Sequence, residues 1–315
     1  MARYILKRLL IAIPVFIGVT VIDYFMMSLA GNPLSMIQGA HVSKAALAAR
    51  SAQLGLNKPV IVQYFTWLTQ VLGGNFGESI KYRQPVGGMI ATHLGPTLLL
   101  MGVSFVISML IALPAGVYSA AHQNQKRDYI LMGLSYLGNS VPSFFLALIL
   151  IYFFTVRLNW LPSSGMTTLG DAQSVGDIVI HMIMPVLVLA ISMVGTNIRY
   201  IRSAVLEILQ QDYLRTARAK GIGRFKVIGK HALRNALIPV ITVLGMEIPV
   251  IFGGAIIIEQ IFSWPGLGLL TMAAILNRDY PVIMGVSLVA ALVVLLGNLL
   301  TDILYAVVDP TIQYQ

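Results

Sequence analysis

The sequence contains no cysteine and very little charge. Without cysteine, disulfides and thiolate metal sites are excluded. Charged residues make up 10% of the 315 residues, whereas a soluble globular domain carries roughly 25%. Hydrophobic residues make up 57%. A chain this poor in charge cannot cover a surface that faces water, so much of its surface must face lipid.

Sequence motifs of catalysis are missing as well. The phosphate-binding pattern Gly-x-x-x-x-Gly-Lys-Ser/Thr is absent, because Gly229-Lys230 is followed by His231 and lacks the earlier glycine. The five histidines are scattered without metal-ligand spacing, and no set of nucleophile and base stands out. We therefore expect no enzyme, no fixed metal and no cofactor in this chain, so that energy for any transport comes from a partner or an ion gradient.

Six apolar runs are long enough to cross a bilayer, which takes about 20 apolar residues in a helix. The first continues to Leu29 without a clear cleavage site, so we expect it to stay as a span rather than to act as a signal peptide. Prolines inside several runs are tolerable where neighbouring helices satisfy the freed backbone groups. The sequence thus predicts an all-α integral membrane protein. The six runs cover roughly residues 9–29, 97–119, 131–156, 178–198, 236–258 and 282–307.

Lysine and arginine placement predicts the orientation. With the N-terminus inside, the cytoplasmic segments carry 14 of the 21 basic residues and the outer segments carry seven. This two-to-one bias places both termini in the cytoplasm.

Residues 31–94 form an outer insert after the first span. The sequence predicts a helix near Ser43–Leu54 and an amphipathic helix over Val60–Leu72, ended by the glycines of 73–77. We expect a small structured subdomain. The alternative is a helix that lies on the membrane with its aromatic residues at the interface.

The inner segment 199–235 has the pattern of two amphipathic helices joined by a glycine elbow at 221–223. The second helix carries a basic stripe of Lys226, Lys230 and Arg234. Two interpretations stay open: a projection that docks a cytoplasmic partner, and a stripe that rests on anionic lipid headgroups.

The elbow carries a resemblance to a known family. Residues 212–221 and 231–239 resemble the cytoplasmic loop of the permease subunits of ABC importers, and within them the dipeptide, oligopeptide and nickel group. The general loop pattern is Glu-Ala-Ala, a glycine four positions later, and then Ile-x-Leu-Pro. The chain keeps Ala217, Gly221 and Leu233, and it departs by Arg215, Thr216, His231 and Arg234, as is usual in the peptide branch.

Other segments resemble the same family in the same order, and the insert after the first span is typical of its B-type permeases. These segments are 53–59, 74–79, 161–165, 261–268, 278–282 and 309–310. The resemblance divides the chain into 1–30 with the first span, the insert 31–94, and a permease core 95–315 that contains the coupling loop 199–235.

The resemblance implies a type I ABC importer permease fold in a bacterial or archaeal cytoplasmic membrane. A second homologous permease would complete the pathway, as a heterodimer rather than a homodimer. Two cytoplasmic ATPases would bind ATP and Mg²⁺, and an outer binding protein would deliver a peptide. The ATPase-coupling residues would be Arg215, Thr216, Ala217, Arg218, Ala219, Lys220, Gly221 and Ile222.

Polar residues in or beside the spans are candidates for function, because they are costly there. We predict that Glu247, Asn139 and Ser140 line the translocation path; for Glu247 the alternative is a hydrogen bond at a subunit interface. An alternative function is a secondary transporter driven by protons, with Asp23, Glu247 and Asp302 as relay. Candidate contacts for the binding protein are Tyr64, Trp67, Asn75 and Phe76.

Overall fold

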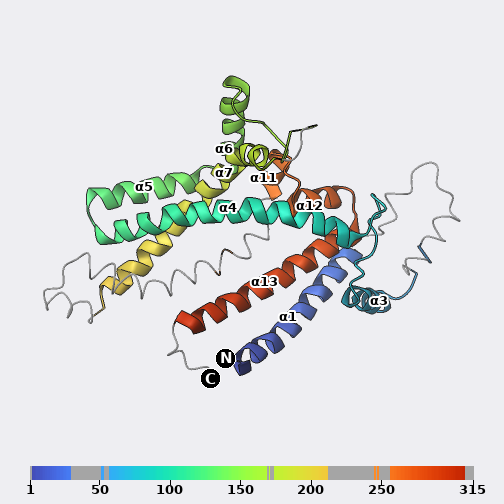
Figure 1. Ribbon diagram of the computed structural model, residues 1–315. Coiled ribbons are helices and arrows are strands. Elements are labelled where there is room, and N and C mark those ends of the chain that lie inside the picture. The colour runs from blue at the N-terminus through green and yellow to red at the C-terminus, as the bar shows by residue number, and fades with distance from the viewer. Residues whose placement is uncertain are drawn as a thin grey trace.

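The computed structural model describes residues 2–29, 51–52, 57–168, 170, 174–211, 245, 247 and 256–308. Every regular element named within these residues is a helix, and the β pairing found there is one isolated bridge between Glu78 and Pro85. The prediction of an all-α membrane protein is confirmed. The long helices dominate the architecture in Figure 1.

Four of the described helices are long and apolar enough to cross a membrane, and a bent pair counts as a fifth if it forms one span. They contain the first, second, fourth and sixth predicted runs, although α4 and α7 extend well beyond the predicted ends. The four helices are α1 (Ala2–Leu29), α4 (Val86–Ala121), α7 (Val175–Leu209) and α13 (Tyr280–Val308).

The third predicted run is broken in the structure. Helix α5 (Lys126–Ser140) ends before Val141, and α6 (Ser143–Leu150) with the π-helix η2 (Ile151–Arg157) continues at 88° to it. The cause is Pro142, which has no N–H to donate and which favours extended backbone at the preceding residue. Val141 accordingly has φ −83° and ψ 121°. By contrast, Pro114 and Pro185 lie inside unbroken helices.

Of the fifth predicted run, the structure describes only Gly245, Glu247 and the part that falls in α11 (Ile256–Ile261). Gly245 and Glu247 are helical. A Cβ on Gly245 would overlap Thr301 of α13. The main chain at residue 245 therefore lies directly against the last span, and only a glycine permits this distance.

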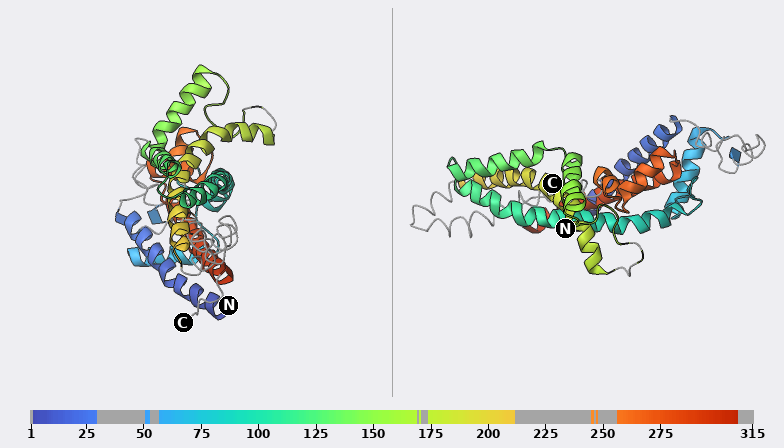
Figure 2. Two further views of the ribbon diagram at one scale, coloured as in Figure 1. Left: turned by 90° about the vertical axis from the view of Figure 1, so that its left-hand side faces the viewer. Right: turned by 90° about the horizontal axis from the view of Figure 1, so that it is seen from above.

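Two helix groups are visible in Figures 1 and 2: α4 with α5 and α7, and α1 with α13. In the first group, small residues allow the helices to pack closely against one another. A Cβ on Gly116 of α4 would lie 2.8 Å from Ile201 of α7, and one on Gly195 of α7 would overlap the carbonyl of Ser135 in α5. Such positions let membrane helices approach closely enough for dispersion to hold them.

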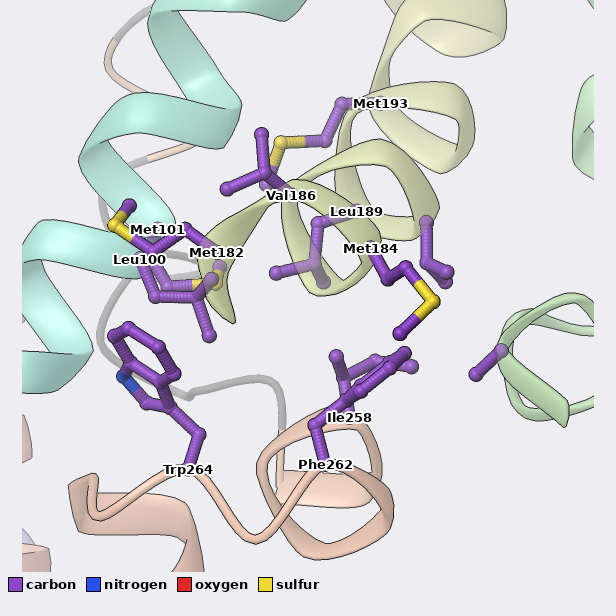
Figure 3. Packing of buried hydrophobic residues seen from close by; sticks show 12 residues of the cluster. Leu100, Met101, Met182, Met184, Val186, Leu189, Met193, Ile258, Phe262 and Trp264 are labelled. Atoms are coloured by element: carbon purple, nitrogen blue, oxygen red, sulfur yellow. The ribbon is translucent and has the colours of Figure 1, made fainter. Parts of the chain in front are cut away.

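The segment before the last span contains two short helices that the sequence analysis did not predict. Helices α11 and α12 (Leu267–Leu276) enclose a turn with Phe262 and Trp264, which are 2% and 0% exposed. In Figure 3 Trp264 lies beside Leu100, Met101 and Met182, and Phe262 lies beside Met184. This turn thus fills the space between α4 and α7 and completes the main core.

In the outer insert, helix α3 covers Val60–Leu72 as predicted, and Gly74 and Gly77 follow with φ of 83° each. A tight turn over 78–85 leads directly into α4. Because α4 begins at Val86, its first turns lie inside the range that the sequence assigned to the insert. The predicted helix near Ser43–Leu54 lies outside the described residues, apart from Ser51 and Ala52, which are helical.

Candidate functional site

Glu247 belongs to a polar group in the apolar interior. Asn197 of α7 is completely buried; its amide donates to the hydroxyl of Ser108 in α4 at 3.2 Å, and it hydrogen-bonds the Glu247 carboxyl. Its Oδ1 has no hydrogen-bond partner among the described residues. The sequence predicted a role for Glu247 but not for Asn197 or Ser108. A single amide or hydroxyl in an apolar span does not indicate a site until its hydrogen-bond partner is known.

Asn139 lies at the end of α5 and reaches α7 instead of Glu247. In the amide orientation that satisfies its donors and acceptors, Asn139 donates to the Ser192 carbonyl at 2.9 Å and accepts from Thr196 at 2.7 Å and from Arg199 at 2.9 Å. The Arg199 guanidinium also lies 5.1 Å from the centroid of the exposed Tyr136 ring. The α7 partners of Asn139 (Ser192, Thr196 and Arg199) therefore lie close in sequence to Asn197, which is the α7 partner of Glu247.

Ser140 is used locally. Its hydroxyl donates to the Tyr136 carbonyl one helical turn earlier at 2.8 Å, and its side chain is exposed. This hydrogen bond stays within α5 and does not connect Ser140 to Glu247.

Asp23 and Asp302, the two other candidates for a proton relay, each form a contact between α1 and α13. Asp23 accepts from the Ser287 hydroxyl at 2.6 Å, and Asp302 forms an ion pair with Arg8 at 3.0 Å. Both therefore have partners that hold the same two helices together at different heights.

Two of the three aromatic residues of α3, Tyr64 and Trp67, pack against α1, whereas Phe65 is exposed. Tyr64 is 5% exposed, and its hydroxyl shares a 3.1 Å hydrogen bond with Thr20. The rings of Trp67 and Tyr24 have centroids 5.6 Å apart. Phe76 packs against the buried cluster around Val86, whereas Asn75 is exposed. Of the four predicted contacts for a binding protein, Asn75 thus presents the most open side chain.

A buried carboxylate joins the turn over 78–85 to the last span. Asp279, 1% exposed, accepts from the Ser79 hydroxyl at 2.5 Å and from the amides of Ile80 and Lys81 at 3.1 and 3.3 Å. The Ser79 hydroxyl in turn accepts from the amide of Tyr82 at 2.9 Å. The turn is therefore held by the residue that immediately precedes α13.

A second buried carboxylate, Glu259, caps the short helix α12. It accepts from the amides of Gly268 and Leu269 at 2.7 and 3.1 Å and from the hydroxyl of Thr97 at 2.8 Å. Carboxylates are stabilised at a helix N-terminus by its free amides and its dipole. A Cβ on Gly266 would overlap both Glu259 and Thr97, so glycine is required there.

At the opposite end of α4 lies a third carboxylate, Asp128, which is 2% exposed. Arg202 of α7 binds both its oxygens, and the Ser119 hydroxyl and the amide of Asn124 complete its hydrogen bonds. The sequence showed only an acid at the start of a span and a basic residue at the end of another, so this pairing was missed.

The predicted coupling residues lie outside the described residues. The structure does describe the approach to them: α7 continues through Leu209 as one helix, with Ile201 and Val205 buried against α4. The expected apolar face of the first inner helix is confirmed, as an extension of the span itself. Within the described residues, no group of three or more His, Asp or Glu is placed to hold a metal ion.

Comparison with known proteins gives a match along nearly the whole chain. The family described as "Binding-protein-dependent transport system inner membrane component" matches residues 112–314, and the N-terminal family of such membrane components matches residues 1–89. Similar proteins include the oligopeptide transport system permease protein AppB of Bacillus subtilis, 43% identical over 316 residues, and the glutathione transport system permease protein GsiC of Salmonella choleraesuis, 39% identical over 316 residues. Both alignments cover 100% of each chain.

Among solved structures, a chain of the inward-facing MetNI methionine ABC transporter is similar, with a TM-score of 0.57 and 18% identity over 70% of this chain and 96% of that one. At this identity the similarity shows a shared fold.

Proposed function

This chain belongs to the family of inner membrane components of binding-protein-dependent transport systems, and on that premise we propose that it is a permease subunit of an ATP-driven importer of peptides. The observation that carries this proposal is the full-length similarity to AppB and GsiC, both named as permeases for peptide-like cargo. Glutathione is a tripeptide, so these two names share one chemical class of substrate.

In the complete transporter, two copies of the permease fold form the translocation pathway, and this chain supplies one of them. The second copy is a homologous subunit, and a heterodimer follows the family pattern. The exposed apolar faces of α1, α4 and α5 support this assignment, because they need lipid or another protein to cover them. Both termini lie in the cytoplasm in this arrangement, in agreement with the bias of basic residues.

In the path, we assign Glu247 to the ammonium group of a peptide. A carboxylate in the membrane is costly and is retained where it has a partner or a function. Glu247 is only partly buried and already has one hydrogen bond, to Asn197. Its remaining acceptor capacity suits a cation.

Energy enters through partners in this proposal. The elbow Arg215–Ile222 docks on one of two cytoplasmic ATPases, which bind ATP and Mg²⁺. The rigid continuation of α7 through Leu209 supports this role, since a helix without a break transmits displacement from the elbow into the span. The binding protein delivers cargo at the opposite side, next to the turn held by Asp279.

The test is purification of this subunit from its native membrane in mild detergent, followed by mass spectrometry and reconstitution into vesicles. We expect a second permease, ATPase subunits and a binding protein to be recovered, and peptide uptake to require ATP. Uptake by this chain alone, driven by a proton gradient without ATP, would overturn the proposal and favour the secondary transporter. The local pairing of Asp23 and Asp302 with Ser287 and Arg8 speaks against that relay.

A further inference from the structure

The outer turn over 78–85 presents cationic side chains on a braced backbone. Its ends are joined by hydrogen bonds from the amide of Ser79 to the carbonyl of Gln84 at 2.9 Å and from the amide of Arg83 to the carbonyl of Ser79 at 3.1 Å. Lys81, Tyr82 and Arg83 at its tip are exposed. Glu78 at its base is an exposed carboxylate as well.

Asp279 links this tip to a third cation. The carboxylate that binds the turn through Ser79, Ile80 and Lys81 belongs to the residue directly after Arg278, which is exposed. Two chain segments far apart in sequence thus place Lys81, Arg83 and Arg278 around one buried anchor. Asp279 keeps its own charge out of solvent, so the exposed surface carries three cations against the one carboxylate of Glu78 and is basic on balance.

Both arginines adopt backbone conformations that are unfavourable for their residue type. Arg83 has φ 55° and Arg278 has φ 49°. Glycine or asparagine occupies this left-handed region at lower cost. Strain of this kind persists where the surrounding structure enforces it, and it collects at functional sites. At both positions the backbone is thus fixed by the surrounding hydrogen bonds, and an arginine side chain is presented from it.

We infer that Lys81, Arg83 and Arg278, with Tyr82 between them, form a docking surface for an acidic patch on the extracytoplasmic binding protein. This inference rests on the proposed function. Arginine and tyrosine are enriched in the centres of protein interfaces. A rigid presentation lowers the ordering cost of association, and complementary charge steers the encounter. Lipid headgroups would need no such bracing, since lysine and arginine reach them by flexible extension.

The contact also has a route into the membrane. Asp279 precedes α13 directly, and the amide of Ile283 donates to its carbonyl at 3.0 Å. A force on the turn therefore acts on the start of α13, the helix that packs against α1. Docking at this surface is thus mechanically connected to the last span.

The test uses glycine at the two left-handed positions, because Arg83→Gly and Arg278→Gly remove the guanidinium and favour the same backbone. The double variant, in the full complex in nanodiscs of zwitterionic lipid, is titrated with the binding protein recovered with the complex. We expect roughly tenfold weaker binding at low salt, in line with the loss of two exposed charge pairs. The difference should shrink at high salt, because exposed charges are screened. Basal ATP hydrolysis without binding protein should stay unchanged.

The matched control is Arg157→Gln, which removes an exposed arginine that instead donates to Tyr152 at 2.9 Å; it should leave the affinity unchanged. Equal affinity of the double variant and the unaltered complex would overturn the docking surface. So would a defect seen only in nanodiscs with anionic lipid, because that result assigns the cations to headgroups. If the binding protein fails to stimulate ATP hydrolysis even in the unaltered complex, the proposed function itself is wrong.

Discussion

Arg202 binds Asp128 through two hydrogen bonds of 2.7 Å, from Nε to Oδ1 and from a terminal nitrogen to Oδ2. The ion pair joins the last turns of α7 to the first turn of α5, and Ser119 adds the end of α4. These three helix ends meet where α7 leads toward the predicted coupling elbow. The pair therefore makes one rigid body of the part that would receive force from an ATPase.

Replacing Asp128 by asparagine should destabilise the protein by about 1–3 kcal/mol, because Asp128 is buried but the Arg202 side chain is 20% exposed and keeps partial contact with solvent. The loss arises because Arg202 would keep its charge and lose its counterion. Thermal unfolding in detergent measures the effect. The control is Arg127→Gln at the neighbouring exposed residue, which donates to the Tyr118 hydroxyl and should change stability by less than about 0.5 kcal/mol. Equal unfolding midpoints for the two variants would contradict the importance of the pair.

Glu259→Ala should destabilise the segment before the last span by several kcal/mol. Each buried donor left unpaired costs about 1–3 kcal/mol, and the amides of Gly268 and Leu269 both lose their acceptor. Glu259→Gln should recover much of the loss, because its carbonyl oxygen can still accept from these amides and its NH₂ can donate to Thr97. Unfolding midpoints of the two variants test this order. A glutamine variant as unstable as the alanine variant would show that the negative charge, and not the geometry, holds α12.

Gly116→Ala should weaken the packing of α4 on α7, because its Cβ would lie 2.8 Å from Ile201 and force the helices apart. We expect a loss of about 1–3 kcal/mol, typical of an overpacked site. Gly102→Ala on the same helix is the matched control, since a Cβ there meets nothing within 4 Å in this chain. Alanine has the higher helix propensity, so this control should be neutral or slightly stabilising. A similar unfolding midpoint for both would argue against close packing at Gly116.

Glu247→Gln tests the path assignment. The substitution keeps the size of the side chain and removes the charge, so uptake of peptides with a free amino terminus should fall more than uptake of the same peptides acetylated at that end. Competition between the two peptide forms in vesicles measures the preference. Unchanged uptake and unchanged preference would assign Glu247 to a structural hydrogen bond with Asn197.

Deleting residues 217–222 tests the elbow. Membrane insertion should survive, because the deletion spares every predicted span, whereas the ATPase subunits should no longer copurify. Retained ATPase binding after this deletion would place the docking site elsewhere. Lys226→Ala with Lys230→Ala is the companion experiment, because it changes the basic stripe of the second inner helix. If that stripe rests on lipid headgroups, ATPase binding should stay intact.

The sequence by itself determined the membrane class, the described spans and helix α3. These features follow from apolar run length and from local stop signals such as Gly73, which act without reference to the rest of the chain. The resemblance to the family was recognised from short sequence motifs, which can be identified without the tertiary structure. The sequence also placed prolines inside several spans, Pro142 among them, but it did not predict the 88° bend, because the direction after a proline depends on what the next segment packs against.

Only the tertiary structure decided which polar residues meet. Asp128 and Arg202 are 74 positions apart and Ser79 and Asp279 are 200 apart, and no local pattern connects them. The same holds for Tyr64. The sequence made it a candidate contact for a binding protein, but in the structure it is buried against α1. A buried carboxylate is tolerated only with its donors in place, so these pairings depend on the assembled helices, and the helices depend on close approaches at single glycines such as Gly116.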